Sequence, residues 1–540
     1  MEIKKIKIGE KVVMPFTIPS GIVTTQVSSL EKLAREVPEL GILTTKSIGP
    51  EPRFGNKEPI LATYAPNCFM NAVGLTNPGV ENFAKELSKS NFPNDKFLLA
   101  SIFGKDVDEF VYVAKTLEDQ IDGFELNLSC PHAKGYGMQL GQDPEMVSKI
   151  TRAITSITKK PVFAKLTPNA GNIQEIAKSA VEAGAYGITA INTVGPGYHS
   201  LEGNPVLTNQ LGGMSGQGIL PVGLKCVRQI REGIGDKIPI IGMGGIRTAR
   251  DIIEYRNSGA DIFGVGSGLA AMTDENIKLY FEAAVADIKN NGESKLSSQL
   301  LRDVDMSYRR VEITKKTDHA NDFKVFRTNA NYVCKPGQFV FAWVPGVGEK
   351  PFSIMDNEPF TLGIQEAGEF TRRFNQLEEG SSFYIRGPYG QEAPIDFEDD
   401  RIVLVGGGCG IAGITSLAKR LKEISPTILL GARDKDHIPY LDQLKQWGNV
   451  YIATEDGSAG VKGYVTDLFK EAEPAPSSQF FNCGPSAMIE AVTRLERSLS
   501  KPEHIFSSHD YITSCGVGLC GKCADPSGRR SCIEGPYLNS

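Results

Sequence analysis

The stretch PVFAKLTPNAGNIQEIAKSAVEAGAYGITAIN, residues 161–192, contains one complete strand–helix–strand unit. Short apolar runs at 161–166 and 187–192 flank NIQEIAKSAVEAGA, which has a helical pattern. Two such strands joined through a helix are the repeating unit of α/β folds. This stretch therefore predicts a parallel sheet covered by helices.

The same alternation fills residues 1–290, where VDEFVYVAKTLEDQI and GLKCVRQIREGIG are further helical patterns. Eight strands are expected, at 16–23, 41–48, 97–103, 123–128, 161–166, 187–192, 238–242 and 262–265. Eight strands alternating with helices over this length predict a (β/α)8 barrel. A doubly wound open sheet is the alternative, and the strand count disfavours it.

The pattern changes after residue 290, so we expect further domains. Polar residues 291–302 are expected to be a linker. Residues 303–398 carry short alternating runs such as QFVFAWV and FTLGIQ, which predict a small antiparallel β-barrel. Residues 399–505 return to strand–helix alternation and predict a nucleotide-binding α/β domain, and residues 506–540 hold a cysteine cluster.

Length and composition are those of a multidomain globular protein. A chain of 540 residues is too long for one hydrophobic core, and its apolar fraction of 41% is ordinary. A net charge of −6 with scattered basic residues argues against a nucleic-acid partner. Neither a membrane-spanning apolar run nor a signal peptide is found, so a cytoplasmic protein is expected.

Four of the ten cysteines lie in the last 26 residues, in CGVGLCGKCADPSGRRSC. The first three have the spacing of plant-type [2Fe–2S] ligands, and glycines between them let the backbone wrap closely around the sulfurs. A zinc site is the alternative, but zinc ribbons favour two separated C-x2-C pairs. The predicted cluster ligands are Cys515, Cys520, Cys523 and Cys532.

The glycine-rich strand exit RIVLVGGGCGIAGI predicts space for a dinucleotide pyrophosphate at a helix N-terminus. A tight strand–helix crossing would use glycine as well, but FFNCGP ends a strand on the same side of the sheet, where a ligand is expected. The predicted NAD contacts are Gly406, Gly407, Gly408, Gly410, Cys483, Gly484 and Pro485.

Active sites of (β/α)8 barrels form at the C-terminal ends of the strands. Those ends supply amides, two lysines and a thiol, but no carboxylate pair for hydrolysis. GMGGI and GVGSG follow strands seven and eight, where barrels bind a phosphate, so an FMN phosphate is expected there. Lys165 is expected to face the negative N1–C2 edge of the reduced flavin.

Residues 303–540 resemble the ferredoxin reductase superfamily, and within it the electron-transfer subunit of NAD-linked dihydroorotate dehydrogenases. The resemblance is carried by KPFS, the GGGxG domain, the CGP segment and the C-terminal cysteines with CIEGPYL. Lysine replaces the usual arginine at 350, and Ala412-Gly413 replaces Ala-Pro. The resemblance implies FAD bound by Lys350, Pro351, Phe352, Ser353, Ile364 and Thr371.

The barrel half resembles the soluble dihydroorotate dehydrogenases, through TTKSIGPEPRFGN, NAVGLTNPG, NLSCPH, AKLTPN, INTVGPG, GGMSG and GMGGI. In that family the NLSCP thiol is the general base, which implies that Cys130 removes the C5 proton of dihydroorotate while a hydride leaves C6 for FMN. A buried inert cysteine is the alternative for Cys130. A homodimer is also implied.

The resemblance implies two overlapping sets of contacts. Substrate contacts are Lys46, Asn71, Ala72, Val73, Gly74, Leu75, Asn127, His132, Asn192 and Thr193. FMN contacts are Ser20, Gly21, Lys46, Ser47, Ser101, Asn127, Lys165, Ile191, Gly216, Gly244, Gly245, Gly266 and Ser267.

Two positions depart from the family pattern, because Ser101 and His132 stand where many members carry asparagine. The sequence CPH is also similar to dihydropyrimidine dehydrogenase, so an NAD(P)H-dependent dihydropyrimidine or enone reductase is an alternative. A non-catalytic electron-transfer module is a second alternative. The expected enzyme is a fusion that passes electrons from dihydroorotate through FMN, [2Fe–2S] and FAD to NAD+, with NADP left open by Arg433.

Overall fold

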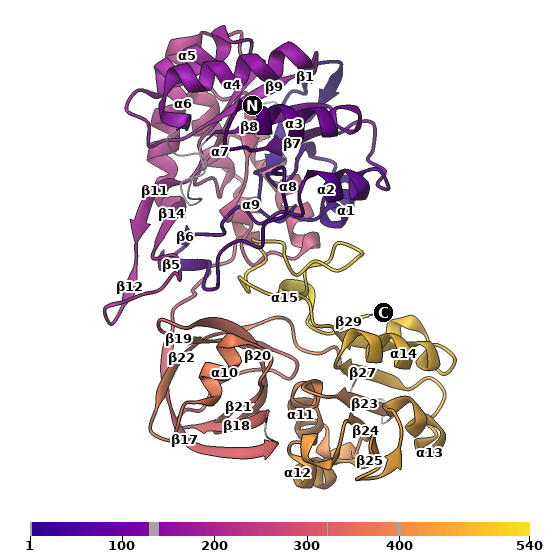
Figure 1. The fold of residues 1–540 in the computed structure, drawn as a ribbon. Helices are drawn as coiled ribbons and strands as arrows, with labels where there is room; N and C mark the ends of the chain where they lie inside the picture. The colour runs from indigo at the N-terminus through magenta and orange to yellow at the C-terminus, as the bar shows by residue number, and fades with distance from the viewer. Residues whose placement is uncertain (1–2, 129–139, 321, 397–400, 540) are drawn as a thin grey trace. The chain divides into compact units, whose positions relative to one another are not determined.

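The computed structural model describes residues 3–128, 140–320, 322–396 and 401–539. The chain forms two compact units (Figure 1). The first unit comprises Met1–Asp305 with Val517–Arg529, and the second comprises Met306–Gly516 with Arg530–Ser540. Along the described residues, no helix is both long enough and apolar enough to span a membrane.

The core of the first unit is a closed barrel of eight parallel strands, in the order β10-β15-β16-β3-β4-β7-β8-β9. This confirms the predicted (β/α)8 barrel, and each expected strand is present in shortened form. The strands are β3 Phe16–Ile18, β4 Leu40–Thr44, β7 Phe97–Ile102, β8 Gly123–Asn127, β9 Val162–Leu166, β10 Gly187–Ala190, β15 Ile240–Met243 and β16 Ile262–Gly264.

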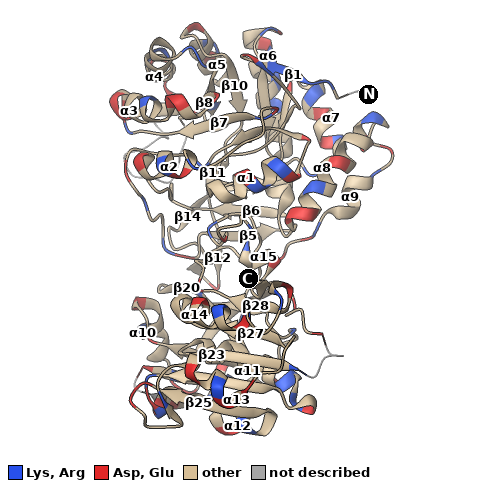
Figure 2. Ribbon diagram, turned by 90° about the vertical axis from the view of Figure 1, so that its right-hand side faces the viewer, with Lys and Arg blue, Asp and Glu red and all other residues tan. Residues whose placement is uncertain are grey.

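Eight helices accompany the barrel strands. Five of them begin at a residue whose side chain accepts a backbone N–H bond, which stabilises a helix start by about 1 kcal/mol, namely Asp106, Asp143, Asn172, Thr248 and Thr273. Helices such as α1 and α8 carry both acidic and basic residues (Figure 2). The helices are α1 Val27–Glu36, α2 Val80–Leu87, α3 Val107–Leu117, α4 Pro144–Ile157, α5 Ile173–Glu182, α6 Leu220–Ile234, α7 Ala249–Asn257 and α8 Asp274–Lys289.

Short additional strands extend the barrel at its loops. The hairpin of β1 (Ile6–Ile8) and β2 (Lys11–Val13) contributes Ile8 and Val13 to an apolar cluster with barrel-strand side chains. A four-stranded sheet in the order β11-β14-β6-β5 is formed by barrel loops. Its strands are β11 Val194–Tyr198, β14 Leu211–Gly216, β6 Cys68–Asn71 and β5 Leu61–Ala65, and β12 Ser200–Leu201 pairs with β13 Asn204–Pro205 beside it.

The stretch expected as a linker contains a helix, α9 Leu296–Leu300. The buried carboxylate of Asp287 in α8 accepts hydrogen bonds from the backbone N–H groups of Leu296 and Ser297, both at 2.8 Å. Its oxygens also accept from the hydroxyls of Ser294 and Ser297. Polar composition alone did not reveal this attachment, because Asp287 lies upstream of the stretch.

The segment Val517–Arg529 belongs to the first unit through hydrogen bonds to its backbone carbonyls. The backbone N–H of Val23 donates to Leu519 O at 2.8 Å, and the hydroxyl of Thr25 donates to Cys520 O at 2.8 Å. Further donors from the start of α1 are the side chains of Gln26, Ser28 and Ser29. These hydrogen bonds all end on backbone carbonyls of the segment, so they depend on its backbone path.

The second unit begins with a closed antiparallel barrel, in the order β17-β18-β21-β20-β19-β22, as the alternating runs predicted. Its inward side chains form one apolar cluster that includes Phe326, Phe374 and Phe383. The elements are β17 Arg309–Ala320, β18 Phe323–Thr328, β19 Phe339–Val344, β20 Gly348–Asn357, β21 Phe360–Gln365, α10 Glu369–Asn375 and β22 Ser382–Tyr389.

A seven-stranded sheet in the order β26-β25-β24-β23-β27-β28-β29 completes this unit, and it is parallel except for β29. It confirms the predicted α/β domain. The strands are β23 Ile402–Gly407, β24 Thr427–Ala432, β25 Asn449–Thr454, β26 Val461–Lys462, β27 Gln479–Cys483, β28 Ile505–Ser508 and β29 Leu538–Asn539. The helices are α11 Gly410–Arg420, α12 Leu441–Trp447, α13 Phe469–Ala472 and α14 Ser486–Glu496, with α15 Ser531–Glu534 near the end.

Candidate active site

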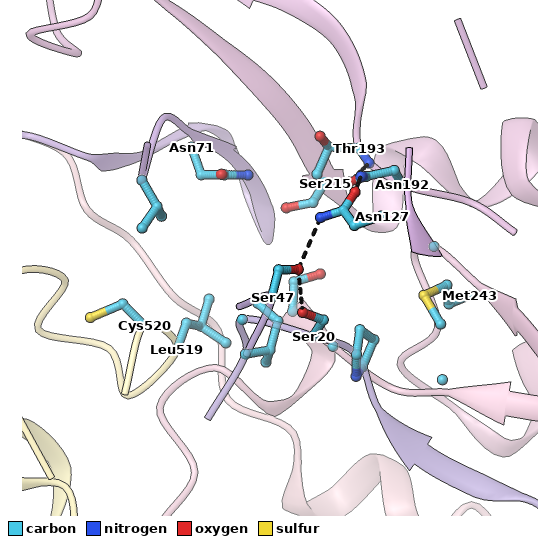
Figure 3. A pocket seen from close by; sticks show the side chains of 18 of the residues that line it. Ser20, Ser47, Asn71, Asn127, Asn192, Thr193, Ser215, Met243, Leu519 and Cys520 are labelled. Carbon is cyan, nitrogen blue, oxygen red and sulfur yellow. Dashed lines mark hydrogen bonds between the residues drawn. The ribbon is translucent and has the colours of Figure 1, made fainter. Parts of the chain in front are cut away.

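The first unit has a cavity at the C-terminal ends of its barrel strands (Figure 3). Most of the residues predicted from the strand ends and from the family resemblance line it together. They are Ser20, Gly21, Lys46, Ser47, Asn71, Val73, Gly74, Leu75, Asn127, Lys165, Ile191, Asn192, Thr193, Gly244, Gly245, Gly266 and Ser267.

Amides and hydroxyls on one wall of this cavity are hydrogen-bonded to one another (Figure 3). The Asn127 Nδ2 donates to Ser47 Oγ at 2.9 Å, and Ser47 shares a 2.9 Å bond with Ser20 Oγ. Asn192 Nδ2 donates to Asn127 Oδ1 at 3.4 Å, while Asn192 Oδ1 accepts from the backbone N–H of Thr193. These bonds fix the orientation of the amides before a ligand binds.

A buried ion pair lies beside this wall. The Lys165 Nζ is 3.1 Å from Glu125 Oε1, and both side chains are at most 5% exposed. Ser101 Oγ donates to the same Glu125 oxygen at 3.0 Å and shares a 2.9 Å bond with Ser47. Ser101 therefore lies behind the cavity wall and does not line it.

Lys46 follows β4 and brings a second ammonium group to the cavity. Its side chain is largely buried, and its Nζ lies over Gly21, where an added Cβ would meet it at 3.0 Å. Gly21 has φ +81°, a conformation that favours glycine. The Lys46 ammonium group therefore lies next to the backbone of Gly21.

Glycines line the part of the cavity after β15 and β16. Gly244 and Gly245 have φ values of +125° and +79°, and a Cβ on Gly245 would meet the backbone N of Leu220 at 2.7 Å. Ser267 begins a short 3-10 helix directly after Gly266. These glycines are packed closely against neighbouring chain, and they line the cavity at the place where barrels bind a phosphate.

Several predicted residues lie elsewhere. Ala72, Ser101 and Gly216 do not line the cavity. Ser215, one residue before Gly216, does line it, because side chains alternate along β14. Cys130 and His132 lie outside the described residues.

Other lining residues were not predicted to line this cavity. Met243 is the last residue of β15 and lies within the glycine motif GMGGI. Leu519 and Cys520 also line the cavity, and they belong to the segment Val517–Arg529, far along the chain from Gly21. Only the fold could bring them there.

The four C-terminal cysteines are buried. Cys520 and Cys523 belong to the first unit, and Cys515 and Cys532 belong to the second. Among the described residues, no three His, Cys, Asp or Glu side chains are grouped around a single ion position. The four-cysteine ligand set therefore stays a prediction from the sequence.

The backbone beside Cys515 is held tightly in the second unit. Arg386 is fully buried and donates to Cys515 O at 2.9 Å, while its Nε and Nη2 atoms contact Glu349 at 2.6 and 2.7 Å. A Cβ at Gly516, where φ is +81°, would meet Phe341 at 2.9 Å. Glycine is therefore required next to this cysteine, as expected for a backbone that wraps around a cluster.

The second unit has its own cavity between its β-barrel and its parallel sheet. The predicted residues that line it are Lys350, Pro351, Phe352, Ser353, Thr371, Gly410, Cys483, Gly484 and Pro485. Burial raises the pKa of the Cys483 thiol to about 12, so this thiol stays protonated at neutral pH. Phe339, Gln365, Cys409 and His509 were not predicted and line it as well.

Four predicted residues of this unit do not line the cavity. Ile364 points into the β-barrel core, and its neighbours Gly363 and Gln365 face the cavity instead. Gly406 and Gly407 lie against helices, since a Cβ on Gly406 would meet Ile414 at 2.8 Å and a Cβ on Gly407 would collide with Met488. These two positions fit the tight strand–helix crossing, and Gly408, with φ +54°, does not line the cavity either.

Comparisons with known proteins match both halves of the chain. The family described as dihydroorotate dehydrogenase matches residues 4–278, and the family described as oxidoreductase NAD-binding domain matches residues 404–494.

Curated relatives carry the name dihydroorotate dehydrogenase B (NAD(+)), catalytic subunit. The protein of Methanocaldococcus jannaschii is 43% identical over 260 residues, which are 47% of this chain and 83% of that protein. The protein of Pyrococcus abyssi is 42% identical over 262 residues, which are 48% of this chain and 85% of that protein. A solved structure of an NADH-dependent reduced ferredoxin-NADP oxidoreductase has 29% identity and a TM-score of 0.39, covering 42% of this chain and 87% of that chain.

Proposed function

The chain belongs to the dihydroorotate dehydrogenase family, and from this premise we propose that it oxidises dihydroorotate to orotate and reduces NAD+. The proposed electron path runs from FMN in the barrel through a [2Fe–2S] cluster and FAD to the nucleotide. The observation that carries the proposal is the cavity at the barrel strand ends, which hydrogen-bonded amides, two lysines and the glycines after β15 and β16 line together.

Amides suit a dihydropyrimidine ring because each offers both a donor and an acceptor to the ring N–H and C=O groups. Asn71, Asn127 and Asn192 all line the cavity, and we assign them to the ring. Such a site discriminates strongly, because an analogue that lacks a polar group leaves a buried amide unpaired.

Lys46 is assigned to the substrate carboxylate. Its largely buried ammonium group lies at the cavity wall beside Gly21. A cation in this position binds dihydroorotate and gives no matching contact to dihydrouracil, which has no carboxylate.

Cys130 is assigned as the base that takes the C5 proton. It follows Asn127 by three residues, and Asn127 ends β8 at the cavity. An ordinary thiol pKa near 8.5 makes proton uptake by the thiolate feasible with modest tuning.

A bound FMN would supply the acceptor for the hydride that leaves C6. Gly244, Gly245, Gly266 and Ser267 would hold its phosphate, and Lys165 would face its ring. In the second unit, Lys350 to Ser353 and Thr371 would hold FAD, and Gly410 and Cys483 to Pro485 would contact NAD.

Steady-state assays test the substrate assignment. We expect NAD+ reduction with dihydroorotate and little with dihydrouracil, and activity with dihydrouracil alone would defeat the proposal. Cys130→Ser should lower turnover at pH 7 by roughly 10²-fold or more, the usual contribution of a general base. Cys226→Ser is the matched control, because Cys226 is a buried cysteine of α6 that does not line the cavity.

A further inference from the structure

We propose that Glu125 is a positioning residue that holds the Lys165 ammonium group and, as its counter-charge, sets the redox potential of the barrel flavin. The inference rests on the proposed function, because it requires a flavin ring against Lys165. It concerns a carboxylate that no sequence motif singled out.

The two charges face each other from neighbouring strands. Glu125 lies on β8 and Lys165 on β9, and the strand register pairs Asn127 with Lys165 and Glu125 with Phe163. The side chain of Lys165 therefore extends from the level of Asn127 to the level of Glu125 in the barrel. There its Nζ lies 3.1 Å from Glu125 Oε1. The exposed fractions of the two side chains are 5% and 1%, so water screens the pair poorly.

Only the lysine of this pair lines the cavity. Glu125 is linked to the cavity wall by a second route, in which Ser101 donates to Glu125 and shares a hydrogen bond with Ser47. Ser47 in turn contacts Ser20 and Asn127, both of which line the cavity. The carboxylate thus orients both the lysine and the hydroxyls of the cavity wall.

Among the described residues, Lys165 is the one cation paired with Glu125. The second carboxylate oxygen, Oε2, is buried and accepts no hydrogen bond from them. The negative charge of Glu125 is therefore compensated mainly by Lys165.

This pairing determines how the site responds to added charge. An oxidised flavin ring is neutral, whereas a ring that has gained a hydride carries a negative charge. Lys165 favours the reduced ring and Glu125 opposes it, and both effects are strong in a poorly screened site. Removal of the carboxylate charge with the ammonium group kept should therefore favour the reduced flavin.

The test is equilibrium redox titration of the holoenzyme with Glu125→Gln. We expect one flavin wave to move to a more positive potential by at least about 30 mV, which is a tenfold change in a two-electron equilibrium constant. Glu125→Asp should shift the same wave in the same direction by less, because it keeps the charge but withdraws it from Lys165. Asp287→Asn, which removes another buried carboxylate of the same unit, should shift neither wave.

The outcomes separate this inference from the proposed function. A flavin-loaded Glu125→Gln protein with an unchanged or more negative potential would overturn the role of Glu125 alone. If Glu125→Gln does not fold, the Glu125→Asp result decides by the same criterion. A wild-type barrel without flavin would instead overturn the proposed function.

Discussion

At the residue scale, a buried carboxyl group sets a pH response in the second unit. Glu496 in α14 is buried, and burial raises its pKa to about 8, although a 2.8 Å hydrogen bond from Asn482 acts in the opposite direction. Since the folded protein holds this proton where the unfolded chain releases it, the free energy of unfolding should fall between about pH 4.5 and pH 8. Hydrogen exchange of β27 should quicken across this range in wild type, and Glu496→Gln should remove that part of the pH dependence. An identical pH dependence in both proteins would contradict the assignment.

Individual residues of the two cavities differ in whether the sequence could predict them. Ser20, Lys46 and Asn127 were predictable because strand ends of a barrel define the cavity. Ile364 missed the cavity of its unit by one position, since a one-residue offset in a strand reverses the face. Glu125 gave no signal, because a single acidic residue in an apolar strand reveals its partner only after the strands are paired.

At the element scale, residues at the start of α1 donate hydrogen bonds to backbone carbonyls of the segment Val517–Arg529. Thr25 donates to Cys520 O and Ser29 donates to Gly528 O. Each such bond contributes about 1 kcal/mol, so Thr25→Val with Ser29→Ala should raise hydrogen exchange within 517–529 and leave the barrel strands protected. Ser156→Ala, which removes an exposed hydroxyl of α4, is the control. Unchanged exchange in the segment would show that other contacts hold it.

At the scale of the whole molecule, local periodicity was sufficient to predict the three folded layouts: the parallel barrel, the antiparallel barrel and the parallel sheet. It could not show that Val517–Arg529 joins the first unit, because that attachment depends on long-range backbone hydrogen bonds. Polar composition predicts a linker at 291–302, whereas the structure has α9 within this stretch, attached to α8 through Asp287.

We propose above all that dihydroorotate reduces FMN and that a [2Fe–2S] cluster of the same chain carries the electrons on to FAD. The most direct measurement is anaerobic mixing of the purified protein with dihydroorotate, with flavin and cluster absorbance recorded together. We predict FMN, FAD and a [2Fe–2S] cluster in equal amounts, with loss of both flavin and cluster absorbance on mixing. Zinc in place of iron, a single kind of flavin, or absorbance that dihydroorotate leaves unchanged would contradict the account.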